Sequence, residues 1–162
     1  MFMRITTKTG DNGYSSVAGK RLKKDNKIFE AIGTIDELQA VILTASSTKQ
    51  KTISKIAEDL YEIMGNIACE TSNLKLVTRI NSLEEEINKL EKELKPLTKF
   101  LIFKKEKARK LNWVRTVIRR AERRVVFLKN KNILVYLNRL SDYYYLLSRI
   151  EEEKYKLRVN RV

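Results

Sequence analysis

The sequence predicts an all-α fold, a five-helix up-and-down bundle with an extended N-terminal loop. After residue 24, almost every segment repeats apolar residues at the i, i+3, i+4, i+7 spacing of an amphipathic helix, and the connections are short. The first 24 residues are rich in Thr, Gly, Ser and Lys without a helical period, so we expect an ordered loop or arm. A chain of 162 residues can bury its own core, which predicts one domain over 1–162.

Two helices are predicted in the N-terminal part of the bundle. Asp25 or Asn26 can cap a helix that runs to about Ser47. Gly33 interrupts this helix and indicates close packing there. Residues 51–72 form the second helix and carry the clearest amphipathic stripe. The apolar positions of the two helices are Ile28, Ile32, Ile35, Leu38, Ile42, Ile53, Ile56, Ala57, Leu60, Ile63, Met64 and Ile67.

Three further helices complete the predicted bundle. The sequence Ser82-Leu-Glu-Glu85 has the form of a capping box, which predicts a helix that starts there and ends before Pro96. The apolar and aromatic segment 97–103 is too short for a helix and is expected to form a strand or a lining loop. Periodic apolar residues then predict helices over 105–129 and 131–155.

The charge balance favours a phosphate-bearing partner. Lys and Arg number 34 against 20 Asp and Glu, a net charge of +14. Residues 104–131 contain twelve basic and two acidic residues, so +10 of the +14 lies there. Such a field suits a nucleotide, a nucleic acid or an anionic membrane surface. Neither an apolar stretch of about 20 residues nor a signal-peptide core is present, which predicts a cytoplasmic protein with no membrane partner.

The residue types present exclude several kinds of catalysis. The chain has no histidine, so neither histidine acid–base chemistry nor a Ser-His-Asp triad is available. The one cysteine, Cys69, allows no intrachain disulfide and no Cys/His metal site, and its apolar surroundings predict a buried thiol. An enzyme of this composition must use positioning, electrostatics or the reactivity of a cofactor.

The segment 115–124 packs five arginines into ten residues. Arg115, Arg119 and Arg123 fall at i, i+4 and i+8, so they share one face of a helix. Apolar residues on the opposite side predict burial against a core. The arginine face is therefore either an ordinary solvated surface or a site for a polyanion. The apolar residues are Val117, Ile118, Ala121 and Val125.

A second candidate anion site lies near the N-terminus, in the loop Thr7–Gly13. Its glycines leave backbone N–H groups accessible, and nearby hydroxyls and a lysine add donors. Ser15, Ser16 and Lys24 could extend this set. The loop does not match the G-x-x-x-x-G-K-[ST] phosphate loop, and an ordinary Gly-Asp turn is the alternative.

Polar residues also interrupt apolar stripes at two places. Asp36 lies among apolar residues in the middle of the first helix, and we expect it to pair with Arg115 or Arg119 unless it is a surface aspartate. Asn138 and Asp142 lie one turn apart on the last helix, which is typical of members of a polar network.

Four segments, Thr7–Gly13, Phe29–Leu38, Arg115–Arg124 and Tyr136–Asp142, together closely resemble the propanediol-utilisation (PduO) type of ATP:cob(I)alamin adenosyltransferase. The resemblance implies a homotrimer of five-helix bundles with active sites between neighbouring subunits. It implies transfer of the 5′-deoxyadenosyl group of ATP to cob(I)alamin, with release of triphosphate and formation of adenosylcobalamin. It further implies Mg²⁺ bound through the ATP phosphates, a flavin reductase and an adenosylcobalamin-dependent mutase as partners, and no nucleic acid.

The same resemblance implies roles for individual residues. Asp36 and Arg115 would form an intersubunit salt bridge on the corrinoid side. Phe100 would be an apolar wall below the cobalt, with Phe103 as a rival. One subunit would hold ATP through Thr7, Lys8, Thr9, Gly10, Ser15, Ser16 and Lys24. The neighbouring subunit would complete the nucleotide site with Arg119, Arg120, Glu122, Arg123 and Asn138.

The sequence departs from the family pattern on the corrinoid side. The stretch Phe100–Lys105 lacks the Pro-Gly-Gly of the family, its spacing to Arg115 is one residue short, and Asn112 stands where the family often has histidine. Two alternatives to the enzyme stay open. One is a non-catalytic ATP or adenosylcobalamin sensor or delivery protein of the same fold. The other is a basic helical protein that binds nucleic acid, which would leave the N-terminal loop and Asp36 without a role.

Overall fold

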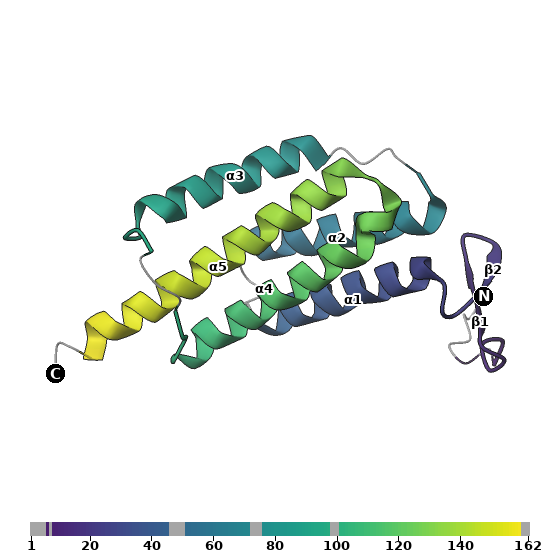
Figure 1. Ribbon diagram of the computed structural model, residues 1–162, viewed down its shortest axis with the longest axis horizontal. Coiled ribbons are helices and arrows are strands. Elements are labelled where there is room, and N and C mark those ends of the chain that lie inside the picture. The colour runs from purple at the N-terminus through teal and green to yellow at the C-terminus, as the bar shows by residue number, and fades with distance from the viewer. Residues whose placement is uncertain (1–5, 7, 46–50, 72–75, 98–100, 160–162) are drawn as a thin grey trace.

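The fold is a bundle of long helices with a small hairpin beside one end (Figure 1). The computed structural model describes residues 6, 8–45, 51–71, 76–97 and 101–159. Within these ranges the predicted all-α class and the five helices are confirmed. The helices are α1 (Lys27–Ala45), α2 (Lys51–Cys69), α3 (Leu76–Lys92), α4 (Glu106–Val125) and α5 (Lys131–Val159), and a 3-10 turn, η1 (Val126–Leu128), follows α4.

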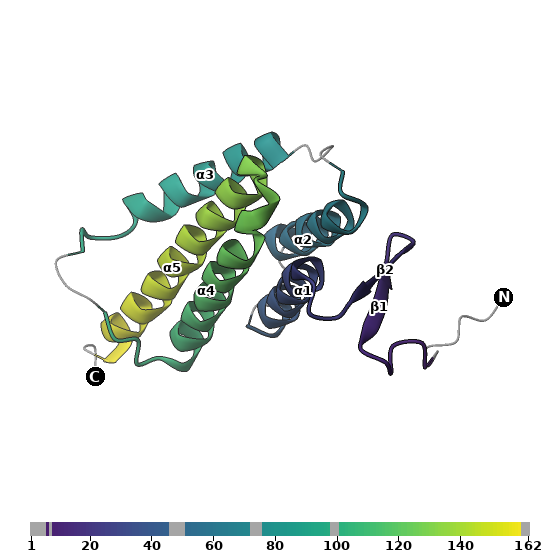
Figure 2. The same ribbon diagram turned by 45° about the vertical axis from the view of Figure 1, so that its right-hand side comes forward.

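Helix α5 lies between α4 and α3, and α1 packs on α4 with α2 beside it (Figure 2). Helices α4 and α5 are antiparallel, because Glu122 contacts Asn138 while Lys107 contacts Glu151. The interior of the bundle is one cluster of buried aliphatic and aromatic side chains. Each such side chain contributes about 1.5–3 kcal/mol on burial, so this cluster fixes how each helix is rotated. No described helix is both long and apolar enough to cross a bilayer.

The N-terminal arm contains a β-hairpin that the sequence reasoning missed. Strands β1 (Tyr14–Val17) and β2 (Lys20–Lys23) pair antiparallel, with Ser15 opposite Leu22. Ala18 and Gly19, at the turn, both have positive φ, +46° and +78°. Two such residues form the turn whose twist matches a two-residue hairpin. Because the strands are short and mostly exposed, they lack the alternation of buried residues by which a strand is recognised.

The start of the third helix was predicted wrongly. Helix α3 begins at Leu76, so Ser82 is an exposed residue inside the helix and caps nothing. Leu76 and Ile80 are both buried, and they extend the stripe of Leu83 and Ile87 by two turns toward the N-terminus. The start of this helix therefore follows the continuous apolar periodicity and not the short capping pattern.

Three smaller predictions about α1 and α2 have mixed outcomes. The cap at Asn26 is confirmed, because its Oδ1 accepts the N–H of Ile28 at 2.9 Å. Gly33 does not mark close packing, since it is exposed and a Cβ there would meet nothing within 4 Å. Cys69 is exposed at the end of α2 and not buried, because α2 ends there, three residues before the predicted end at residue 72.

A buried carboxylate links α2, α3 and α5 outside the arginine region. Asp59 of α2 is only 8% exposed, and its Oδ2 accepts the hydroxyl hydrogen of Tyr136 at 2.9 Å. Arg79 of α3 approaches Asp59 at 3.1 Å and also holds Glu62 at 2.8 Å. Burial raises the pKa of Asp59 although Tyr136 and Arg79 act in the opposite direction, whereas the hydrogen bond from Arg79 lowers the pKa of the more exposed Glu62.

These opposite pKa shifts predict opposite pH dependences of stability. Asp59 keeps its proton in the folded chain at pH values where the unfolded chain has lost it, so its contribution to stability falls as pH rises through that window. The free energy of unfolding of the wild type minus that of Asp59→Asn, measured by urea denaturation from about pH 3 to about pH 7, should therefore decrease. The same difference for Glu62→Gln should increase. Equal signs for the two variants would contradict the assignment.

Candidate active site

The arginine face of α4 is set by the burial of the opposite face. The buried residues of α4 pack on α5 and α1 and recur at helical spacing, which turns the arginines outward. This agrees with the orientation predicted from the sequence. The buried residues are Ala108, Leu111, Val114, Val117, Ile118, Ala121 and Val125.

A groove of about 500 Å³ lies along this face, between α4, α5 and the segment before α4. Arg115 is one of the residues that line it. Its guanidinium is 5.7 Å from the centre of the Tyr145 ring, and its Nε donates to Asn112 Oδ1 at 2.8 Å. Phe103 is buried and meets Tyr145 edge to face, with ring centres 6.2 Å apart. The residues that line this arginine groove are Leu101, Phe103, Asn112, Arg115, Arg119, Ser141, Asp142 and Tyr145.

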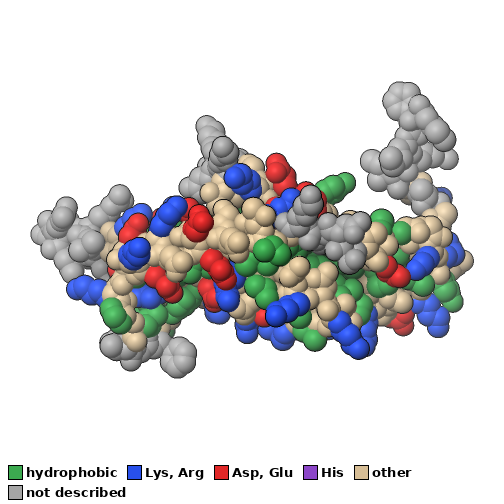
Figure 3. Space-filling model, turned by 90° about the horizontal axis from the view of Figure 1, so that it is seen from above, with side chains coloured by type: hydrophobic (Ala, Val, Ile, Leu, Met, Phe, Trp, Pro, Cys, Tyr) green, Lys and Arg blue, Asp and Glu red, His purple; other side chains and the backbone are tan. Residues whose placement is uncertain are grey.

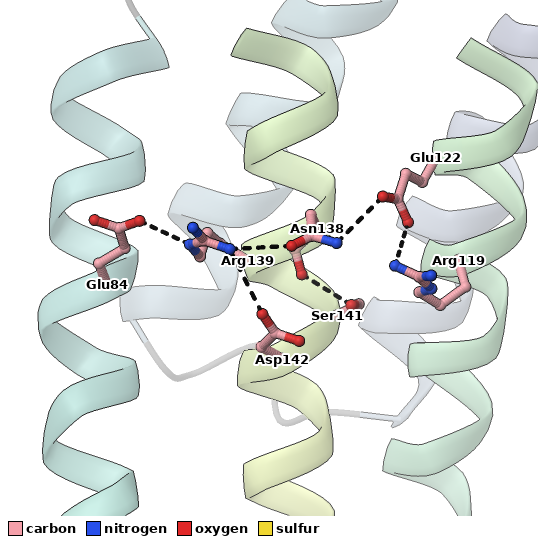
Figure 4. Close-up of polar contacts among 7 residues, drawn as sticks. All are labelled: Glu84, Arg119, Glu122, Asn138, Arg139, Ser141 and Asp142. Carbon is pink, nitrogen blue, oxygen red and sulfur yellow. Dashed lines mark hydrogen bonds and ion pairs between the residues drawn. The ribbon is translucent and has the colours of Figure 1, made fainter. Parts of the chain in front are cut away.

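A chain of polar contacts connects Arg119 to α3 (Figure 4). Arg119 pairs with Glu122 at 2.6 Å, and the other oxygen of Glu122 accepts from the Asn138 amide at 3.2 Å. The side-chain oxygen of Asn138, Oδ1, in turn accepts a hydrogen bond from Arg139 at 3.0 Å, and Arg139 is held by Glu84 of α3 at 2.7 Å. Because Arg139 occupies the carbonyl side of Asn138, the amide donor has to face Glu122. The polar network predicted around Asn138 is confirmed.

Asp142 is the second acidic group beside Arg119, at the rim of the groove. It lies 3.8 Å from Arg139, and the Arg119 guanidinium is also close enough to act on it. Partial burial raises the pKa of Asp142, while the two arginines act in the opposite direction. The groove thus offers two positioned guanidinium groups, Arg119 held by the Glu122 carboxylate and Arg115 by the Asn112 amide oxygen. This pattern suits an incoming polyanion because the cations are already in place.

Arg120, Arg123 and Arg124 of α4 do not line the groove. Arg120 pairs with Glu37 of α1, and Arg124 pairs with Glu30 at 3.0 Å. Arg123 lines a separate hollow of about 340 Å³ near the start of α1. Within one chain, the structure therefore brings Arg115, Arg119, Glu122 and Asn138 together, but not Arg120 and Arg123 with them.

The predicted nucleotide loop lies at the hairpin end of the molecule. Arg21 donates to the Thr9 carbonyl at 3.0 Å, and a Cβ on Gly10 would lie 3.2 Å from Lys24 Nζ. Lys8 adopts a left-handed backbone conformation, with φ of +56°. The predicted residues Ser15 and Ser16 lie on β1, and Thr7 lies outside the described residues. The hairpin extends away from the helices (Figures 1 and 2). None of the described residues that line the arginine groove belongs to the loop or the hairpin, so a single chain presents them as separate sites.

Two predicted residues of the corrinoid side have different outcomes. Asp36 is exposed within one chain, because it faces outward from α1. Among the described residues it forms no ion pair with Arg115, which instead contacts Asn112 and Tyr145. A pairing of Asp36 with Arg115 of a neighbouring subunit stays a prediction. Phe100 lies outside the described residues.

Sequence reasoning missed Tyr145 as a functional candidate. The ring contacts both Arg115 and Phe103, so it supports the polar and the aromatic side of the groove. The one signal was the run Tyr143–Tyr145, in which Tyr143 and Tyr144 are buried in the core and Tyr145 is half-buried. Helical spacing turns the third tyrosine toward α4.

Comparisons with known proteins identify the family. The family model described as cobalamin adenosyltransferase matches residues 5–151. The chain belongs to the cobalamin adenosyltransferase family. The resemblance found in the four sequence motifs is thereby confirmed.

Individual relatives agree with this family. The human corrinoid adenosyltransferase MMAB is 37% identical over 90% of this chain and 68% of its own length. The corrinoid adenosyltransferase of Bacillus subtilis is 35% identical over 91% of this chain and 86% of its own. A variant PduO-type adenosyltransferase from Lactobacillus reuteri, solved with ATP, superposes with a TM-score of 0.83 at 27% identity, over 92% of this chain and 94% of its own. A second variant, with cobalamin and ATP, gives 0.83 at 26% identity over 93% and 91%.

The contacts of Asn138 predict the effect of one substitution in this adenosyltransferase. Asn138→Asp places a carboxylate where the amide donates to Glu122, so like charges meet. We expect the free energy of unfolding at neutral pH to fall by about 1–2 kcal/mol. The loss should shrink as acid protonates the pair.

The control is Asn132→Asp, at an exposed position in the first turn of the same helix. There an acidic residue interacts favourably with the helix dipole, so stability should stay equal or rise by about 0.3–1 kcal/mol. If both variants lost the same free energy in urea denaturation, Asn138 would not be held as described.

Proposed function

We propose that this chain transfers the 5′-deoxyadenosyl group of ATP to the cobalt of a reduced corrinoid, and that residues 1–162 act as one adenosyltransferase domain. The family and the names of the relatives, which are corrinoid adenosyltransferases, support this activity. ATP and cobalamin are the ligands of the related Lactobacillus reuteri structures. The observation that carries the proposal is the arginine groove, where cations for a triphosphate adjoin an aromatic wall for a corrin.

The proposed reaction needs no side-chain base. The lone pair of Co(I) attacks C5′ of ATP, a cobalt–carbon bond forms, and the bond from C5′ to oxygen breaks. Its electrons leave on triphosphate, whose growing charge needs nearby cations. A chain without histidine suits this chemistry, because the nucleophile requires no proton removal.

The proposed division of roles follows the two sides of the groove. Arg119, held by Glu122 and indirectly by Asn138, would stabilise the triphosphate, and Arg115 above Tyr145 would lie on the corrinoid side. Phe103 is a described candidate for the apolar wall, with Phe100 as the alternative. Mg²⁺ would be bound through the ATP phosphates. Among the described residues there is no group of three or more acidic, His or Cys side chains placed to hold a metal ion.

We further propose that the active site forms between subunits of a homotrimer. The loop around Lys8 and Gly10 would hold ATP from one subunit, and Arg119, Arg120 and Arg123 would approach from the neighbour. In one chain, none of the described residues that line the groove belongs to the loop or the hairpin, which supports this arrangement, as does the exposed position of Asp36. The chain would work in the cytoplasm, receiving reduced corrinoid from a flavin reductase and delivering adenosylcobalamin to a mutase.

The altered 100–105 segment supports one alternative, a sensor or delivery protein that binds the same ligands without reacting them. Mixing the protein with Mg-ATP and chemically reduced cobalamin separates the two. The enzyme yields the absorbance of adenosylcobalamin together with equimolar triphosphate. Binding of ATP without either product would favour the sensor. A nucleic-acid role would leave the N-terminal loop without a function, and the face in Figure 3 has basic and acidic side chains interspersed.

Two arginines five residues apart on α4, Arg119 and Arg124, allow a matched test of the groove. Arg119→Ala should lower kcat by at least about a hundredfold, because it removes a cation placed for the leaving group. Arg124→Ala removes only a half-exposed pair with Glu30 and should leave both kcat and the ATP Kd near wild type. Circular dichroism should show both variants folded. Wild-type turnover in Arg119→Ala would refute the assignment.

A mixing experiment tests whether the site is shared. Lys8→Ala and Arg119→Ala should each be inactive alone. Unfolded together and refolded at equal amounts, they should recover about one quarter of wild-type activity, since one interface in four then joins an intact loop to an intact arginine. Recovery should fail if both residues serve the same subunit. Sedimentation of the wild type checks the trimer independently.

A further inference from the structure

We propose that Glu152, near the C-terminal end of α5, is a positioning residue for the corrinoid side of the active site. It would act through the backbone of the segment that enters α4. This inference rests on the proposed function, because it assigns the aromatic end of the arginine groove to the corrinoid. None of the four sequence motifs includes Glu152, and the family match ends at residue 151.

Glu152 is a buried carboxylate that binds main chain. Glu152 is only 3% exposed. Its Oε2 accepts hydrogen bonds from the backbone N–H groups of Lys104 and Lys105, each at 3.0 Å. Among the described residues it has no ion-pair partner. The backbone at Lys105, the N-cap of α4, has no side-chain cap from its own segment. Glu152 therefore takes the place of a capping residue, from a helix 47 residues away in the chain.

The physical setting makes this contact strong. A carboxylate interacts favourably with the partial positive charge at a helix N-terminus, and hydrogen bonds to an ionised acceptor are stronger than neutral ones. Its neighbour Glu151 behaves differently, since it pairs with the side-chain ammonium groups of Lys105 and Lys107 at 3.5 and 2.9 Å. Loss of Glu152 would take the buried acceptor from two partly buried backbone donors, whereas loss of Glu151 would free two lysine side chains that water can solvate.

The anchored backbone leads directly to the groove. Phe103 precedes Lys104, is 9% exposed and meets Tyr145 edge to face at 6.2 Å. The centre of the Tyr145 ring lies 5.7 Å from the guanidinium carbon of Arg115. A shift of the backbone at Lys104 must therefore move Phe103 and the ring that supports Arg115. Arg119 is held separately by Glu122, which also accepts a hydrogen bond from Asn138. The position of Arg119 on the triphosphate side should therefore stay unchanged.

The same anchor explains how the chain can do without Pro-Gly-Gly at this place. Proline would restrict the backbone locally by fixing φ, but the chain has Phe103, Lys104 and Lys105 there. The restriction comes instead from across the bundle, through a carboxylate on α5. The position of the wall residue then depends on the docking of the C-terminal turns of α5.

The test compares Glu152→Ala and Glu152→Gln with Glu151→Gln as the matched control. Glu152→Ala should raise the KM for reduced corrinoid roughly five- to tenfold, while the ATP Kd changes less than about twofold. Glu152→Gln keeps a carbonyl acceptor and should restore most of the loss. Glu151→Gln should behave as wild type.

Hydrogen exchange supplies a readout without turnover. The amides of Lys104 and Lys105 should exchange at least about tenfold faster in Glu152→Ala than in wild type or Glu151→Gln. Faster exchange with an unchanged corrinoid KM would overturn the proposal, as would equal losses for corrinoid and ATP. If Glu152→Ala fails to fold, Glu152→Gln alone decides: protected amides with a raised corrinoid KM contradict the positioning role, and protected amides with a near-normal KM support it. A wild type that transfers no adenosyl group would refute the proposed function instead.

Discussion

The two faces of α4 are the constraint on which the rest depends. One face must be buried between α5 and α1. The other face must keep its guanidinium groups accessible to a ligand and also hold them in place. Both conditions are met because the apolar residues recur every turn and the arginines fall between them. Arg115 lies over Tyr145 of α5, and Arg119 is held by Glu122 of its own helix. The packing of the core therefore determines where the arginines of α4 point. The same buried side chains stabilise the bundle and orient the arginines of the groove.

The sequence was sufficient to predict whatever depends on helical periodicity. The stripes of α1, α2, α4 and α5 predicted the helices and the outward direction of Arg115 and Arg119, and the motifs predicted the family. Short-range patterns were less reliable. The capping pattern at Ser82 predicted the wrong helix start, because the apolar stripe begins at Leu76. The hairpin was missed because its strands are short and mostly exposed.

Long-range contacts could not be predicted from one sequence. Tyr145 beneath Arg115 and Glu152 at the start of α4 depend on how α5 is rotated against α4, which local pattern does not determine. The sequence left Asp36 open between an arginine partner and a surface aspartate, and within one chain it lies on the outer face of α1. A contact between subunits is equally outside the reach of periodicity, since nothing in one chain records its partner.

The carboxylate at Glu152 has a consequence for where this domain ends. The match to the family stops at residue 151, whereas α5 continues to Val159. A fragment cut at the end of the family-model match would keep each of the four motifs and lose Glu152, whose carboxylate accepts the backbone N–H groups at the start of α4. A buried contact with the backbone therefore lies one residue beyond that match.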